Sequence, residues 1–215
     1  HWFAVKLLKR RWLTLSLTIV IIAGSIYGTS KVWINSSFLD KFENDSDIVQ
    51  TDRFINDHFG GTSTLNLILE SNESGAFKTP EILRLVDELQ NDVETIDIVG
   101  SSFGLTDYLK RMNQVMHADN KDFNIIPEST DLIAQYLLLY EMSGDPDNLW
   151  KVTDPEYRKL NMVFQLKSDN SKAINQTMDH IENYRERFNQ SGVNLNYAGS
   201  GYKALVFTDL ILEGQ

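Results

Sequence analysis

Four histidines are the side chains of this sequence best suited to metal binding or to acid–base chemistry near neutral pH. They are His1, His58, His117 and His180, and no two of them stand at a ligand spacing such as H-x-x-x-H. We therefore expect each histidine to be solvated or bonded within its own neighbourhood. The chain has no cysteine, which excludes a disulfide framework and thiolate metal sites.

Two short segments have the composition of a chemical site but lack its pattern. "GSSFG" at residues 100–104 has neither the G-x-x-x-x-G-K-[ST] phosphate loop nor the G-x-S-x-G nucleophile elbow, so we expect a plain turn. "DKFENDSDIVQTD" at residues 40–52 lacks the central glycine and the final glutamate of a calcium loop. We expect a solvated acidic linker or a helix start there. No catalytic residue, metal ligand or cofactor is expected, and we do not expect an enzyme.

A stripe of tyrosine and leucine runs from Tyr136 to Tyr140. At helical spacing such a stripe is usually part of a hydrophobic core. The alternative is an apolar wall that faces a hydrophobic substrate.

The N-terminal segment combines a basic cluster with a long apolar run. The cluster is Lys6, Lys9, Arg10 and Arg11, and residues 12–30 are 19 uncharged, mostly apolar residues. In a helix they would extend about 28 Å, close to the ~30 Å hydrocarbon core of a bilayer. Trp12 and Trp33 bracket the segment as interfacial aromatics do. We expect a transmembrane helix over residues 12–33.

Two other interpretations of this segment stay open: a cleaved signal peptide and a buried soluble helix. A signal peptide has a shorter apolar region of roughly 7–15 residues, whereas Ile26, Tyr27 and Val32 continue the apolar character here. The positive-inside bias makes residues 1–11 a cytoplasmic basic leader and puts residues after about 34 outside.

The remainder of the chain is strongly acidic. Residues 40–215 hold 15 of the 20 basic residues and all 30 acidic ones, a net charge of −15. Nucleic acid and anionic lipid headgroups would repel such a surface. A segment of 176 residues is long enough to bury its own core. Because the chain begins with His1 and ends within an amphipathic pattern, we expect it to be a fragment.

Hydrophobic periodicity predicts alternating strands and helices after residue 62. Thr79 and Pro80 mark a helix start, and Ile82, Leu85, Val86, Leu89 and Val93 form its apolar stripe. The predicted strands cover residues 63–70, 96–102 (ending at Gly100), 159–167 and 193–198. The other predicted helices cover residues 105–116, 131–142 and 171–189, with a last helix from Tyr202 after Gly199 and Gly201.

The predicted order is β-α-β, two inserted helices and a second β-α-β. This order is typical of an α+β, ferredoxin-like split β-α-β fold with a helical insertion at about residues 105–150. Alternation in the strands predicts a sheet covered by helices on one face only. Asn161, Gln165, Asn194 and Asn196 lie on the other face, which we expect to meet water or another module.

Three stretches resemble bacterial exporters of the resistance-nodulation-division (RND) superfamily, MMPL type. "FLDKFENDSDIVQTDRFINDHFGGTSTLNLILES" is similar to the segment between the first helix of a half-repeat and its first porter strand. "LTDYLKRMNQVMHADN" with "IIPESTDLIAQYLLLYEMSGDPDNL" resembles the helical insertion, closer to the exporters' second half. "YAGSGYKALVFTDLILEGQ" is similar to the stretch that re-enters the next membrane helix.

The resemblance implies an inner-membrane, proton-driven exporter of lipids or other hydrophobic molecules. Residues 34–62 would be a linker with an amphipathic helix, and residues 63–215 a periplasmic porter domain. Its partners would be the other membrane helices, a paired porter domain, the lipid substrate and the membrane, with a homo-oligomer also compatible. Such exporters take up protons through ionisable residues in later membrane helices, and residues 12–30 contain none. This fragment alone would therefore not pump.

Two other classes of protein remain. The first is a single-pass anchored binding or sensory domain, because a fold alone does not determine function. The second is an exported enzyme, which would require a polar cleft with clustered titratable groups.

Overall fold

The computed structural model describes residues 11–29, 37, 39–143 and 146–213. The chain divides into two units, His1–Asn35 and Ser36–Gln215. Most of the expected basic leader and residues 30–33 of the expected membrane helix lie outside the described residues, as does His1.

The first unit contains one described helix, α2 (Arg11–Thr29). Its large apolar side chains are solvent-exposed, among them Leu17, Val20, Ile22 and Ile26. Among the described residues, no helix has both the length and the hydropathy required to cross a bilayer. The transmembrane helix over residues 12–33 stays a prediction.

A four-stranded antiparallel sheet forms the centre of the second unit, which confirms the α+β class. The strands are β1 (Ser63–Ser71), β2 (Val99–Phe103), β3 (Lys159–Leu166) and β4 (Val193–Ala198). Their order is β2-β3-β1-β4, and each neighbouring pair is antiparallel. Leu67 stands opposite Met162 on one side and Tyr197 on the other.

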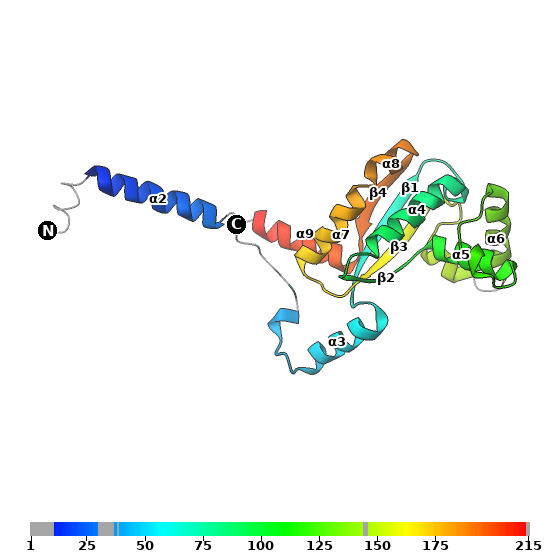
Figure 1. The fold of residues 1–215 in the computed structure, drawn as a ribbon, viewed down its shortest axis with the longest axis horizontal. Helices are drawn as coiled ribbons and strands as arrows, with labels where there is room; N and C mark the ends of the chain where they lie inside the picture. Colours follow the sequence, from blue (N-terminus) through cyan, green and yellow to red (C-terminus); the bar gives the residue numbers. More distant parts are fainter. Residues whose placement is uncertain (1–10, 30–36, 38, 144–145, 214–215) are drawn as a thin grey trace. The chain divides into compact units, whose positions relative to one another are not determined.

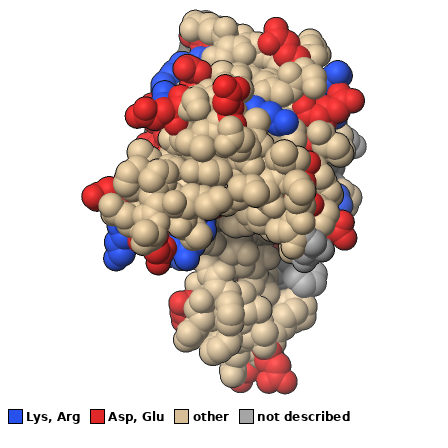
Figure 2. Space-filling model, turned by 90° about the vertical axis from the view of Figure 1, so that its right-hand side faces the viewer, with Lys and Arg blue, Asp and Glu red and all other residues tan. Residues whose placement is uncertain are grey.

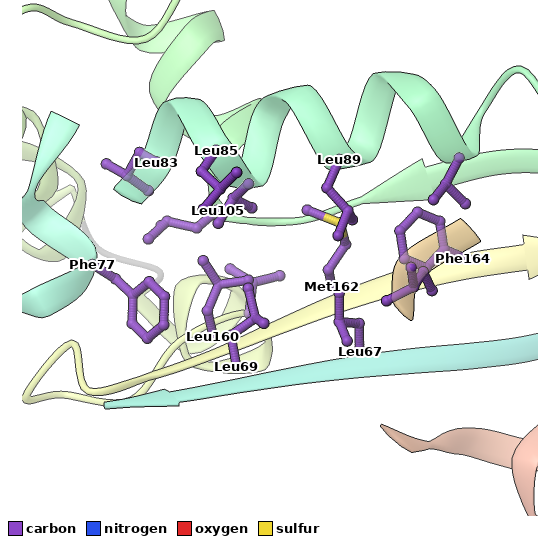
Figure 3. Close-up of a cluster of buried hydrophobic side chains, with 14 of the residues drawn as sticks. Leu67, Leu69, Phe77, Leu83, Leu85, Leu89, Leu105, Leu160, Met162 and Phe164 are labelled. Atoms are coloured by element: carbon purple, nitrogen blue, oxygen red, sulfur yellow. The ribbon is translucent and has the colours of Figure 1, made fainter. Parts of the chain in front are cut away.

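One face of the sheet is covered by the helices α4 (Pro80–Val93), α7 (Ser171–Glu182) and α8 (Arg185–Gln190), whose apolar residues share a single core with the strands. Figure 3 shows Leu85 and Leu89 of α4 above Leu160 and Met162 of β3. These four side chains are at most 8% exposed. Full burial of a side chain of this size contributes about 1.5–3 kcal/mol. The alternation of the sequence is therefore the pattern of a sheet with one covered face.

Between β2 and β3 the chain is helical. This insertion contains α5 (Leu105–Met116), η3 (Lys121–Phe123), α6 (Thr130–Met142) and η4 (Pro146–Lys151), and it lies at one end of the sheet (Figure 1). The bounds of α5 and α6 match the predicted helices to within one residue. Ser129 caps α6 by accepting a hydrogen bond from the Leu132 N–H, which fixes where the helix begins.

A short helical segment precedes β1. It comprises η1 (Leu39–Lys41) and α3 (Asp47–Phe59), so the acidic residues 40–52 include a helix start, one of the two expected outcomes. Gly60 ends α3 in the left-handed conformation, at φ 88°. The Asn56 amide donates a 3.0 Å hydrogen bond to the Lys167 carbonyl, which attaches α3 to the chain just after β3.

The structure corrects the predicted strand over residues 96–102 and the predicted turn over residues 100–104. The strand begins only at Val99, because the Ile96 and Val99 N–H groups bond to carbonyls three residues earlier. The strand does not end at Gly100 but continues to Phe103, with a bulge between Val99 and Ser101. The segment "GSSFG" is therefore strand followed by the residue that caps α5, Gly104.

Two helix predictions also had wrong bounds. The helix expected over residues 171–189 is divided at Asn183–Tyr184 into α7 and α8, and there Arg185 bonds to both Glu182 and the Leu195 carbonyl. The last helix, α9 (Gly199–Glu213), starts before Tyr202. Gly199, at φ 100°, fits so closely against the Thr64 carbonyl that a Cβ would lie 2.6 Å from that oxygen. A larger residue at position 199 would therefore collide with β1.

Candidate binding surface

The histidines do not form a site in the structure. The Nδ1 atoms of His58, His117 and His180 lie 2.8, 2.8 and 3.2 Å from the carbonyl oxygen four residues earlier in the chain. Because a carbonyl only accepts, each Nδ1 is the protonated nitrogen. The local bonding expected for these three is confirmed. Across the described residues, no three histidine or carboxylate side chains gather as a metal site would require.

The tyrosine and leucine stripe on α6 divides between core and surface. Tyr136 and Leu137 are buried, and the Tyr136 hydroxyl donates a 3.2 Å hydrogen bond to Asn113 on α5. Burial raises the pKa of Tyr136 above its usual value. Leu138 and Leu139 are 54% and 47% exposed. In Figure 2 the end of the domain that carries α5 and α6 faces the viewer, and a broad area without charged side chains crosses its middle. The core role is confirmed for Tyr136 and Leu137, and the role as a wall for a hydrophobic substrate stays a prediction.

The uncovered face of the sheet, which we call the open face, carries mostly uncharged polar side chains. It includes the four predicted residues, Asn161, Gln165, Asn194 and Asn196, together with Asn66 opposite Val163. The Asn66 amide donates a 3.0 Å hydrogen bond to Asn161 Oδ1. This face is therefore mainly polar and does not form a second hydrophobic core.

A pocket of about 600 Å³ hollows the open face beside β2 and β3. We call it the open-face pocket. Its lining includes Ser101, Phe103, Tyr108, Lys151, Asn161 and Gln165.

Its position follows from the way the insertion leaves and rejoins the sheet. β2 pairs with β3 as far as Phe103, which stands opposite Val163. The chain returns to the same edge of β3 at Val152, whose carbonyl accepts from the Asn161 N–H at 2.9 Å, and at the bridge between Thr153 and Leu160. Residues at both points, Phe103 and Val152, line the pocket.

Aromatic rings form one wall of the pocket. Phe103 meets Tyr108 edge to face at 5.2 Å between ring centroids, and Tyr108 meets Tyr140 of α6 at 5.1 Å. Such pairs contribute about 0.5–1.5 kcal/mol beyond their buried area. Phe103 is 45% exposed, so its ring also offers apolar surface to a bound molecule.

The other wall of the pocket is formed by η4, which packs against Tyr157. Trp150 packs edge to face against the Tyr157 ring at 6.3 Å, and Lys78 lies over that ring at 4.1 Å. Tyr157 is buried, and its hydroxyl donates to the Glu141 carboxylate. Burial, followed by the hydrogen bond to Glu141, raises the pKa of Tyr157 far above its usual value. Tyr157 therefore supports η4 through its ring and is attached to α6 through its hydroxyl.

Sequence reasoning found the polar face but not the pocket. Asn161 and Gln165 were predicted on the open face, whereas Phe103, Tyr108 and Lys151 were not associated with them. No family model matches this chain, and no curated protein or solved structure matches it.

Proposed function

We propose that the chain is the leading membrane helix and a periplasmic porter domain of a proton-driven RND-superfamily exporter of the MMPL type, from its second half. The substrate would be a lipid or another hydrophobic molecule. The observation that carries the proposal is the pocket on the open, mostly uncharged face of the antiparallel sheet. The sequence resemblance supplies the family.

The strand arrangement supports the finer fold assignment within this proposal, a ferredoxin-like porter domain. In that fold two β-α-β units interleave to give the antiparallel order β2-β3-β1-β4, and the same order is found here. The helical insertion between the two units is the further feature that the exporters share.

The apolar surfaces support a path for a hydrophobic substrate. Leu138, Leu139 and Met142 of α6 are exposed, and Phe103 forms part of the pocket wall. Monomeric soluble domains seldom expose contiguous apolar surface without a binding role. A hydrophobic molecule would move along the open face between this domain and its paired porter domain.

We place the chain in the bacterial inner membrane, with α2 spanning the bilayer and the second unit in the periplasm. Exposed apolar residues along α2 support this placement, as does the basic cluster before it. The domain would rock as the other membrane helices take up protons, an alternating-access scheme. Residues 12–29 of α2 contain no Asp, Glu, His, Lys or Arg, so proton coupling has to come from the partner helices. No enzymatic step is assigned to this chain.

The parent reading frame tests the exporter assignment. We expect several further apolar runs of about 20 residues downstream, with an acidic residue inside at least one of them. Amide substitution of that acidic residue should abolish proton-dependent export by the parent protein. A reading frame that stops shortly after residue 215 would contradict the proposal and favour a single-pass anchored binding domain.

A further inference from the structure

The hydrogen-bonding groups of the open-face pocket are unevenly engaged. Three side-chain oxygens in or beside it already accept from protein donors. Gln165 Oε1 accepts from Ser101 at 2.7 Å, Asn148 Oδ1 from Lys151 at 2.7 Å, and Asn161 Oδ1 from Asn66 at 3.0 Å.

Donors, by contrast, remain available. The Lys151 ammonium has three N–H groups, of which one bonds to Asn148 Oδ1. The two N–H groups of the Gln165 amide have no partner among the residues that the structure describes. Each of the three amide oxygens accepts a bond already, whereas these remaining N–H groups have none within the described residues, so the pocket favours a ligand that brings oxygen acceptors.

Charge favours the same kind of ligand. The pocket lining contains Lys151 and no aspartate or glutamate, although residues 40–215 carry a net charge of −15. Within the described part of the chain, no carboxylate lies within ion-pair distance of Lys151. An anionic oxygen group would give this ammonium a charge-assisted partner.

The rest of the lining is apolar. Phe103, Val152 and Val163 border the pocket, and the Phe103 ring is 45% exposed. We propose that the open-face pocket binds an anionic amphiphile: its charged oxygens bond to Lys151 and the Gln165 amide, and its apolar part lies against Phe103 and Val163. This inference rests on the proposed function, because it names the class of substrate that the porter domain accepts.

Two sources could supply such a ligand, a phospholipid and a soluble aromatic acid. The test titrates the complete chain in phosphatidylcholine nanodiscs with dihexanoylphosphatidate and, separately, with 2-naphthoate. Dihexanoylglycerol and 2-naphthamide are the matched uncharged probes. Amide chemical shifts at Ser101 and Gln165 report the site. We expect one or both anionic probes to shift these signals. The probe that binds more tightly indicates whether the ligand is a phospholipid or a soluble aromatic acid.

Three variants test the residues. Lys151→Gln should weaken the binding of the anionic probe about tenfold, because a charge-assisted hydrogen bond is lost. Lys151→Arg keeps the positive charge and should retain the affinity. Lys172→Gln, an exposed lysine of α7, is the matched control and should change nothing. Val163→Trp should fill the pocket and block both anionic probes, with thermal unfolding as the check that it folds.

Several results would overturn the inference. One is that the charged and uncharged probes bind equally well. Another is that Lys151→Gln and Lys172→Gln bind the anionic probe with the same affinity. A third is that neither anion shifts the Ser101 and Gln165 signals at millimolar concentration. Failure of the exporter proposal would look different. In that case the parent reading frame lacks further membrane helices while the Lys151-dependent binding of the anionic probe persists.

Discussion

The Tyr157 hydroxyl donates a hydrogen bond to the Glu141 carboxylate and so joins the last turn of α6 to the loop before β3. Tyr157 holds this place in the left-handed backbone region, at φ 52°, which is uncommon for a bulky residue. Its own carbonyl accepts from the Phe77 N–H at 3.1 Å. One residue therefore connects the helical insertion, the sheet and the segment before α4.

Replacing Tyr157 by phenylalanine should lower the free energy of unfolding by about 1.5–3 kcal/mol, the usual range for a hydrogen bond to a charged group. The ring would keep its packing against Trp150, so the loss should come from the hydroxyl alone. Urea unfolding at pH 7 measures it. Tyr140→Phe is the control, because no hydrogen bond of the Tyr140 hydroxyl is seen among the described residues. Equal effects in the two variants would refute the role of the Glu141 bond.

Gly100→Ala should destabilise the domain by about 1–3 kcal/mol, the usual cost of overpacking. A Cβ at Gly100 would lie 1.7 Å from the Gly60 carbonyl oxygen, so the end of α3 would have to move. Thermal unfolding measures the loss, and limited proteolysis reports whether α3 has separated from the sheet. At Gly104, the comparison site, a Cβ would meet Met162 at an ordinary 3.4 Å, so alanine there should cost only the weaker cap of α5, about 0.5–1 kcal/mol. If both alanine variants unfold at the same temperature, the close approach of Gly60 to Gly100 is not a constraint.

Glu182 should contribute to the acid sensitivity of the fold. Its hydrogen bonds to Arg185 lower its pKa below the ordinary 4.5, and a bond from Tyr197 at 2.6 Å lowers it further. Because the folded-state pKa is depressed, this stabilisation is present above about pH 4.5 and is lost as the pH falls through the lower, folded-state value.

Glu182→Gln should therefore lower stability more at pH 7 than at pH 3, by at most about 1 kcal/mol because the pair is partly exposed. Urea midpoints at the two pH values provide the comparison. Glu128→Gln, at an exposed position, is the control and should shift the urea midpoint equally at pH 7 and pH 3. A Glu182→Gln effect that does not depend on pH would contradict the assignment.

Local patterns predicted most of the fold. The alternation of Leu160, Met162, Phe164 and Leu166 predicted β3 and its buried face, and all four are fully buried. The start of α4 at Pro80 followed from proline at a first helical position. These features depend on neighbours within a few residues, which is why the sequence suffices to find them.

The features that were missed depend on distant segments. From its neighbours in the sequence, Gly100 is predicted to be a turn residue. In the structure the Gly60 backbone packs against it, a contact between residues forty positions apart. The open-face pocket requires Phe103 and Val152 to meet the same edge of β3, which periodicity does not encode. The division between α7 and α8 contains no glycine or proline to mark it.

The proposed periplasmic location of the second unit is open to one direct measurement. The chain has no native cysteine, so a single Asn72→Cys variant, at an exposed position after β1, can be probed with a membrane-impermeant maleimide on intact spheroplasts. Lys6→Cys, in the basic leader, is the matched variant for the cytoplasmic side. We expect labelling of the Asn72→Cys variant in intact spheroplasts and of the Lys6→Cys variant only after permeabilisation. The reverse pattern would place the domain in the cytoplasm and contradict the porter assignment.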